Sequence, residues 1–377
     1  MFLFTFLLGR IIEKIRVPWI FSALLLGSIL AVWNPFESVT SSEVFTFLAQ
    51  LGMYFLLFII GFEIDLRKLK RKSRFILKAT FFIILLEAFF GSILVHYVFS
   101  VPWLTSILVA LSFATVGEAI LVPILDEFRI VNSRLGQTII GIGTFDDIIE
   151  VFALIFAVVL ISSQFSASFL WIVLASLFLL FFLAFGLTKL KEGGQTFSFL
   201  SIETLFLFAI FLIFLFLGVG ELADAAPLGA LLAGIALKNF LPKNRLKLIK
   251  SEIRTLCYGF FAPIFFLWVG ISMDMGYLAS FPLLILLVVA VSKGAKILGS
   301  FLIGRKELGL KQSVLLGIGL SVRFSTSIII IKLLLENALI GPELYSVIVA
   351  SSIVFKFVIP VLFSNLLVKW GFAKATS

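Results

Sequence analysis

The chain has 377 residues, of which 61% are hydrophobic and only 14% charged, and its mean hydropathy is +1.20. A water-soluble protein of this length does not need so large an apolar fraction to build its core, so the ordinary soluble classes are excluded. One cysteine, Cys257, excludes a disulfide framework within the chain. The net charge of +9 suggests acidic partners or nucleic acid only if the basic residues lie on a surface in water. Lipid is the expected solvent for most of this chain.

Apolar stretches of about 20 residues recur from end to end, which is the length that crosses a bilayer as an α-helix. β-barrel strands would alternate in units of about ten residues instead. We therefore predict an all-α polytopic membrane protein with about 13 transmembrane helices. In chain order they are expected at residues 1–15, 17–33, 44–64, 75–99, 103–125, 134–162, 166–188, 199–220, 226–241, 253–273, 279–304, 312–335 and 342–368.

The basic residues gather in alternate connections between these helices. Most of the 30 lysines and arginines lie in the odd-numbered connections, for example in residues 67–74 and 243–254. The positive-inside rule places those connections in the cytoplasm, with the N-terminus outside and the C-terminus inside a cell membrane. Orientation and attraction to lipid headgroups explain the net charge, so the bilayer is the expected partner and nucleic acid is not.

The two halves of the chain match at a displacement of 209 residues. At this shift Gly61 and Asp65 align with Gly270 and Asp274, and Ser112 aligns with Ser321. The matching segments lie seven helices apart, and an odd displacement turns the second copy upside down. Inverted repeats of this kind are typical of secondary transporters, whose sites lie near the midplane at interrupted helices.

Two matching segments, 111–118 and 320–327, carry small and hydroxylated residues in mid-span and are the expected crossing broken helices. Unwound backbone at this depth is tolerated only where it lines a cavity. Glu118 and Arg323 are expected to compensate the dipoles of the half-helices. The residues expected to line the interruptions are Ser112, Thr115, Ser321 and Ser325.

Two adjacent carboxylates, Asp146 and Asp147, lie about ten residues from either end of the predicted helix 134–162. One such group at the bilayer centre costs about 2.5–3.5 kcal/mol on insertion scales. Burial and mutual repulsion favour protonation of at least one of them, and its deprotonated form presents hard oxygens to a cation. We interpret the pair as a proton- and cation-binding site, with Thr144 and Glu150 as accessory candidates. A purely structural Asp–Lys ion pair is the alternative.

Lys293 and Lys296 lie on one face of the predicted helix 279–304. Lys296 is the better partner for the aspartates, because Gly299 permits the close approach of a neighbouring helix. Lys293 is an accessory candidate. Three further lysines within helices, Lys78, Lys332 and Lys356, are expected to extend toward the membrane interface.

These residues resemble those of the monovalent cation:proton antiporters, in the branch with two consecutive aspartates that includes the bacterial sodium/proton exchangers. Further similarities are Val17-Pro18 at the start of the second helix, Gly61 to Leu66 at the end of the third, and Ser321 to Arg323. The resemblance implies electrogenic exchange of about two protons per Na⁺ without a cofactor. Asp147 would be the carrier, and Asp146 would alternate between a salt bridge with Lys296 and a free state. Phe324, Glu118 and Glu150 depart from the family pattern.

The resemblance also implies a homodimer with elevator-type movement. Residues 1–66 and 195–275 would form a fixed scaffold that carries the dimer contacts, and residues 72–163 and 279–371 would form a moving core. Residues 164–192 would be the linker helix between the two copies of the repeat.

Other functions remain open at this point. Potassium efflux is an alternative within transport, and a sodium-coupled solute symporter is a second one. An intramembrane aspartic protease would bring its two acids from facing helices, whereas these are consecutive. Gly141-x-Gly143 and Gly317-x-Gly319 lie within apolar spans and lack the strand that a dinucleotide site requires, so neither a nucleotide cofactor nor an enzyme is expected.

Overall fold

A computed structural model describes residues 2–13, 19–64, 74–114, 125–126, 128–162, 175–176, 178–184, 186, 201–222, 225–241, 243–321 and 325–372. These residues form helices and turns, and no strand occurs among them. The helices of the first half are α1 (Phe2–Glu13), α2 (Phe21–Val32), α3 (Glu37–Thr40), α4 (Glu43–Glu63), α5 (Arg74–Phe99), α6 (Trp103–Ala114) and α8 (Arg134–Ser162).

The second half begins with α10 (Ile202–Glu221), α11 (Ala226–Phe240) and α12 (Lys243–Leu256). A π-helical turn, η3 (Cys257–Phe261), joins α12 to α13 (Ala262–Ile271). The remaining helices are α14 (Met275–Ser280), α15 (Pro282–Leu308), α16 (Leu310–Gly319), α17 (Ser325–Glu336) and α18 (Pro342–Lys369).

Within the described residues, six helical segments are long and apolar enough to cross a membrane. They are residues 43–63, 74–99, 202–221, 248–271, 282–308 and 342–369. Shorter apolar helices are α2, which precedes them in the chain, and α6 and α11, which lie between them. The predicted all-α membrane fold is confirmed. Most of the helix predicted at 166–188 lies outside the described residues.

The predicted boundaries differ from the structure chiefly where a helix continues beyond its apolar part. The helix predicted to begin at residue 253 begins at Lys243, because α12 is a basic amphipathic segment that hydropathy does not detect. The short helices α3 and α14 also differ from the prediction. They are too short to form apolar spans and lie in connections between the predicted helices.

The inverted repeat is visible in the helix boundaries. Moving the bounds of α5 by 209 residues gives 283–308, and α15 covers Pro282–Leu308. The same displacement moves α8 to 343–371, and α18 covers Pro342–Lys369. The two halves therefore consist of corresponding helices in the same order.

Two glycine crossings lie in similar places of the two halves, where Gly61 matches Gly270 and Gly27 matches Ala236, two residues from Gly234. Helices α4 and α11 meet at Gly61 and Gly234, where a Cβ on Gly234 would lie 2.0 Å from a carbonyl oxygen of α4. Helices α2 and α13 meet at Gly27 and Gly270, where a Cβ on Gly270 would lie 2.3 Å from a carbonyl oxygen of α2. Only glycine permits such close backbone contact, so these helices pack as rigid pairs.

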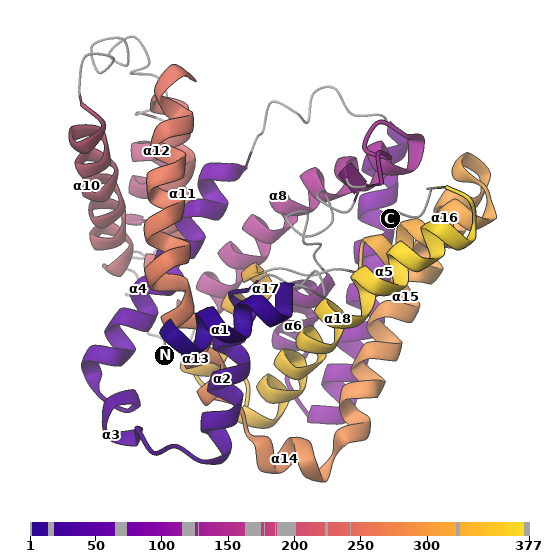
Figure 1. The fold of residues 1–377 in the computed structure, drawn as a ribbon, viewed down its shortest axis with the longest axis horizontal. Coiled ribbons are helices and arrows are strands. Elements are labelled where there is room, and N and C mark those ends of the chain that lie inside the picture. Colours follow the sequence, from indigo (N-terminus) through magenta and orange to yellow (C-terminus); the bar gives the residue numbers. More distant parts are fainter. Residues whose placement is uncertain are drawn as a thin grey trace.

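The helices form two sets by contact (Figure 1). One set contains α1, α2, α4, α10, α11 and α13, and the other contains α5, α6, α8, α15, α16 and α18. Helix α17 packs on α6, α8 and α18 and also reaches α4. The assignment of residue ranges to a scaffold and a core, and the movement of one against the other, stay predictions.

The two ends of the bundle are chemically different. The start of α12 lies at the top of Figure 1, where Lys250 is 2.9 Å from Glu63 at the end of α4. An ion pair of Arg134 with Glu307 joins the start of α8 to the end of α15. The short helices α3 and α14 lie at the opposite end. These positions agree with the predicted separation of basic and non-basic connections.

Candidate ion-binding site

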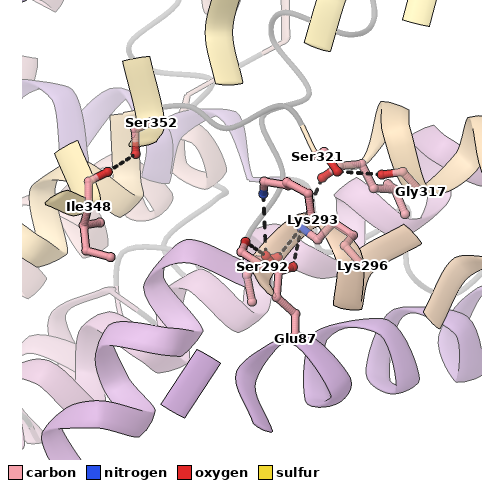
Figure 2. A network of polar contacts seen from close by, with 10 residues as sticks. Glu87, Ser292, Lys293, Lys296, Gly317, Ser321, Ile348 and Ser352 are labelled. Carbon is pink, nitrogen blue, oxygen red and sulfur yellow. Dashed lines mark hydrogen bonds and ion pairs between the residues drawn. The ribbon is translucent and has the colours of Figure 1, made fainter. Parts of the chain in front are cut away.

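An acid and a base meet where α5 and α15 cross, each near the middle of its helix. Lys296 Nζ lies 3.0 Å from Glu87 Oε2, and both side chains are fully buried (Figure 2). A Cβ on Gly299 would lie 3.3 Å from the Leu86 side chain of α5, so this glycine permits the close approach predicted for it. A buried charge is tolerated only when it is paired, so losing either partner would leave an uncompensated charge at the crossing.

Lys296 also contacts the ends of two half-helices. Its Nζ donates to the carbonyl oxygen of Ala114, the last residue of α6, at 2.5 Å. It donates to the carbonyl oxygen of Leu320, which follows the end of α16, at 3.1 Å. Helix C-termini carry a negative partial charge and unpaired carbonyl groups, both of which an ammonium group stabilises. One lysine therefore holds the ends of α6 and α16 together.

One of the two predicted interruptions agrees with a described helix end. Helix α16 ends at Gly319, a turn follows at Leu320 and Ser321, and α17 begins at Ser325 within the predicted segment 320–327. Helix α6 is described as far as Ala114, and residues 115–118 of the other predicted segment lie outside the described residues. Sequence reasoning assigned the compensation of the half-helix dipoles to Glu118 and Arg323, which lie outside the described residues. In the described part of the site, Lys296 makes this contact.

A second lysine faces the same carboxylate. Lys293 Nζ lies 3.5 Å from Glu87 Oε1 and 4.3 Å from the centre of the Phe355 ring on α18. Ser292 Oγ donates a hydrogen bond to the same Oε1. Figure 2 shows both lysines and Ser292 directed toward Glu87. One buried carboxylate therefore meets two ammonium groups and a hydroxyl.

The aspartate pair lies on α8, a helix that packs on α5, α6, α16 and α17. Asp146 is fully buried. Asp147 and Glu150 have helical backbones, and their side chains lie outside what the structure describes. Thr144 Oγ1 donates to the carbonyl oxygen of Ile140 at 2.7 Å, which is a bond within its own helix. Helix α8 thus carries a buried acid and packs on both helices that Lys296 contacts.

The serines of the interruptions are buried. Ser112 Oγ donates to the carbonyl oxygen of Val109 at 2.7 Å, and Ser321 Oγ donates to that of Gly317 at 2.7 Å. Both bonds are local to their helices. Thr115 lies outside the described residues, as does the side chain of Ser325. Their role in lining an ion path stays a prediction.

Glu87 is the residue that sequence reasoning missed. Two signals pointed to it: an acid in the middle of the span 75–99 is as costly as one in α8, and Glu87 lies 209 residues before Lys296. The contacts described for Lys296 are with Glu87 and the two carbonyl oxygens. A salt bridge of Lys296 with Asp146 was predicted from the family resemblance and stays a prediction.

A family model described as "Sodium/hydrogen exchanger, transmembrane" matches residues 2–369, which is nearly the whole chain. The chain belongs to the sodium/hydrogen exchanger family. This membership confirms the predicted class, a membrane antiporter of cations and protons.

Individual sodium/hydrogen exchangers match over most of their length. A probable Na⁺/H⁺ antiporter 3 of Methanocaldococcus jannaschii is 26% identical over 369 residues, which cover 96% of this chain and 94% of that protein. An Na⁺/H⁺ antiporter of Enterococcus hirae is 28% identical over 306 residues, covering 79% of this chain and 78% of that one.

A solved structure of an exchanger has the same fold. The sodium proton antiporter MjNhaP1 of M. jannaschii superimposes with a TM-score of 0.64 at 18% sequence identity, covering 98% of this chain and 96% of that chain. The helices described above therefore have the arrangement of a known sodium/hydrogen exchanger.

Proposed function

We propose that this protein exchanges protons for Na⁺ across the cell membrane at Asp146 and Asp147. The observation that carries the proposal is the full burial of Asp146 on α8, a helix packed on both α6 and α16. Burying an acid within a membrane span costs free energy, so such a residue indicates a function. The names of the relatives favour Na⁺ as the cation.

Competition for the same oxygens couples the two ions. A deprotonated carboxylate is a hard ligand for Na⁺, and the protonated form binds the cation poorly. Asp147 is the carrier in this proposal, and Asp146 is the second acid. If one Na⁺ displaces protons from both, about two protons leave for each Na⁺, and the exchange moves net charge.

Lys296 supplies the countercharge when the cation is absent. In the proposed cycle Asp146 pairs with Lys296 in the empty site and is released when Na⁺ binds. The geometry supports this role, because the lysine is held at the ends of α6 and α16 and α8 packs on both helices.

Access alternates in the proposed cycle by movement of the set α5, α6, α8, α15, α16 and α18 against the other set. The two glycine crossings support a rigid scaffold, since they bring the backbones of α4 and α11, and of α2 and α13, into direct contact. We further propose a homodimer through the scaffold set, with the N-terminus outside. Exposed apolar side chains of α10, including Leu207 and Phe211, provide the surface for such a contact.

The experiment uses proteoliposomes with an imposed pH gradient and a lumenal pH dye, to which Na⁺, Li⁺ and K⁺ are added in turn. Na⁺ is expected to dissipate the gradient, and a K⁺ ionophore clamp should increase the rate if net charge moves. Asp147→Asn is expected to abolish the response. The matched control is Asp274→Asn, because Asp274 caps α14 by accepting from Tyr277 N at 2.8 Å and asparagine can do the same. Absence of a response to all three cations in the unmodified protein would contradict the proposal.

A further inference from the structure

Glu87 holds Lys296, yet the proposed cycle requires the same lysine at Asp146. We propose that Glu87 is a positioning residue for the exchange: it keeps Lys296 on the α5 side while a cation occupies the aspartates, and it releases Lys296 to Asp146 when the cation leaves. This inference rests on the proposed function. It assigns to α5 a part in the cycle that the aspartate pair alone does not include.

Glu87 can release Lys296 at low cost because other groups remain around its carboxylate. Lys293 Nζ lies 3.5 Å from Oε1, and Ser292 Oγ donates to the same oxygen (Figure 2). Removing one partner from a buried ion pair is strongly destabilising when it leaves a bare charge. Here a second ammonium group stays in place, so the movement of Lys296 does not leave the carboxylate uncompensated.

Lys296 is bound to two helices that the helix of Asp146 also contacts. Its Nζ is bound to the carbonyl oxygens of Ala114 and Leu320, which end α6 and follow α16. Helix α8, which carries Asp146, packs on these same two helices. The ammonium group can therefore exchange one carboxylate for another while the helix ends keep it in position.

The choice between Glu87 and Asp146 is decided by competition. A cation on the aspartates repels the ammonium group toward Glu87, and an empty, deprotonated site attracts it. A change that weakens the Glu87–Lys296 pair should make Lys296 compete more strongly with the cation for Asp146. A change that leaves Lys296 as the only ammonium partner of Glu87 should make that competition weaker.

Two single variants test this competition through the KM for Na⁺ in proteoliposomes at fixed pH. Glu87→Gln should raise the KM about tenfold or more with a smaller change in maximal rate, because Lys296 then favours Asp146. Lys293→Met should lower the KM severalfold, because Glu87 then holds Lys296 more strongly. An unchanged or raised KM for Lys293→Met would overturn the proposal.

The double variant Glu87→Gln/Lys293→Met separates competition from simple electrostatics. It leaves the net charge of the cluster as in the unmodified protein, so a general charge effect predicts a restored KM. Competition predicts a KM that stays raised, because Glu87 is still missing and Lys296 can pair only with the aspartate. A KM within about twofold of the unmodified value would overturn the proposal.

The double variant also decides the matter if Glu87→Gln does not fold, because it removes a buried acid and a base together, a change that is often tolerated. The matched control is Glu63→Gln, which removes an acid from a lysine contact at the end of α4 and should leave the KM unchanged. Failure of the proposed function gives a different result, since the unmodified protein would then show no cation response from which a KM could be measured.

Discussion

Replacing Lys296 with methionine keeps most of the side-chain volume and removes the ammonium group. Breaking a buried ion pair from one side costs about 3–5 kcal/mol, and each carbonyl left without a partner costs about 1–3 kcal/mol. Lys293 remains 3.5 Å from Glu87, which places the first cost at its lower limit. With two carbonyl oxygens released, the loss is about 5 kcal/mol. For a chain of this size we expect the unfolding midpoint to fall by roughly 10 °C.

Tryptophan fluorescence of the detergent-purified protein measures this midpoint, since the chain has 6 tryptophans. The matched control is Lys78→Met, which changes an exposed lysine on α5 and should shift the midpoint by no more than about 2 °C. A midpoint for Lys296→Met that equals that of the control would refute the assignment of Lys296 as the group that joins α5, α6 and α16.

Two further stability predictions follow from contacts away from this cluster. Gly234→Ala should destabilise the fold by several kcal/mol, because its Cβ would lie 2.0 Å from a backbone oxygen. Its control is Gly218→Ala, which has nothing within 4 Å and should be neutral or slightly stabilising. Equal unfolding midpoints for these two variants would contradict the prediction. Lys332→Met should cost about 1–3 kcal/mol, since Lys332 is buried and its Nζ donates to Ser272 Oγ at 2.6 Å. Glu336→Gln changes only the part-exposed partner of Lys332 and should lower the unfolding midpoint less than Lys332→Met does. A larger shift for Glu336→Gln than for Lys332→Met would show that the Ser272 bond contributes little.

The spans could be predicted from the sequence because hydrocarbon thickness fixes the length of an apolar helix. The helix predicted at 134–162 has those limits in the structure, and the one predicted at 75–99 begins one residue earlier, at Arg74. The interruption before Ser325 was predictable from the repeat, because two matching segments both carry small and hydroxylated residues in mid-span. Local composition was sufficient for these features.

The partners of the buried charges were less predictable. An ionisable group in a membrane needs a partner, but the residues around it in the sequence do not show which one it has. Lys332 was expected to extend toward the interface. It is buried instead, with its Nζ 3.8 Å from the Trp268 ring of α13 and 2.7 Å from Glu336. The contacts with Trp268 and Ser272, about 60 residues earlier in the chain, decide this outcome, and only the Glu336 pair is local in sequence.

The position of the Glu87–Lys296 pair follows from the repeat. The two residues lie 209 positions apart, the displacement that relates α5 to α15 and α8 to α18. Two points that a two-fold rotation exchanges can be in contact only beside the axis. Both residues lie on α5 and α15, in the set proposed to move, so the pair travels with that set while its surroundings change. The pairing of Lys296 can then follow the occupancy of Asp146 and need not depend on which side of the membrane the site faces.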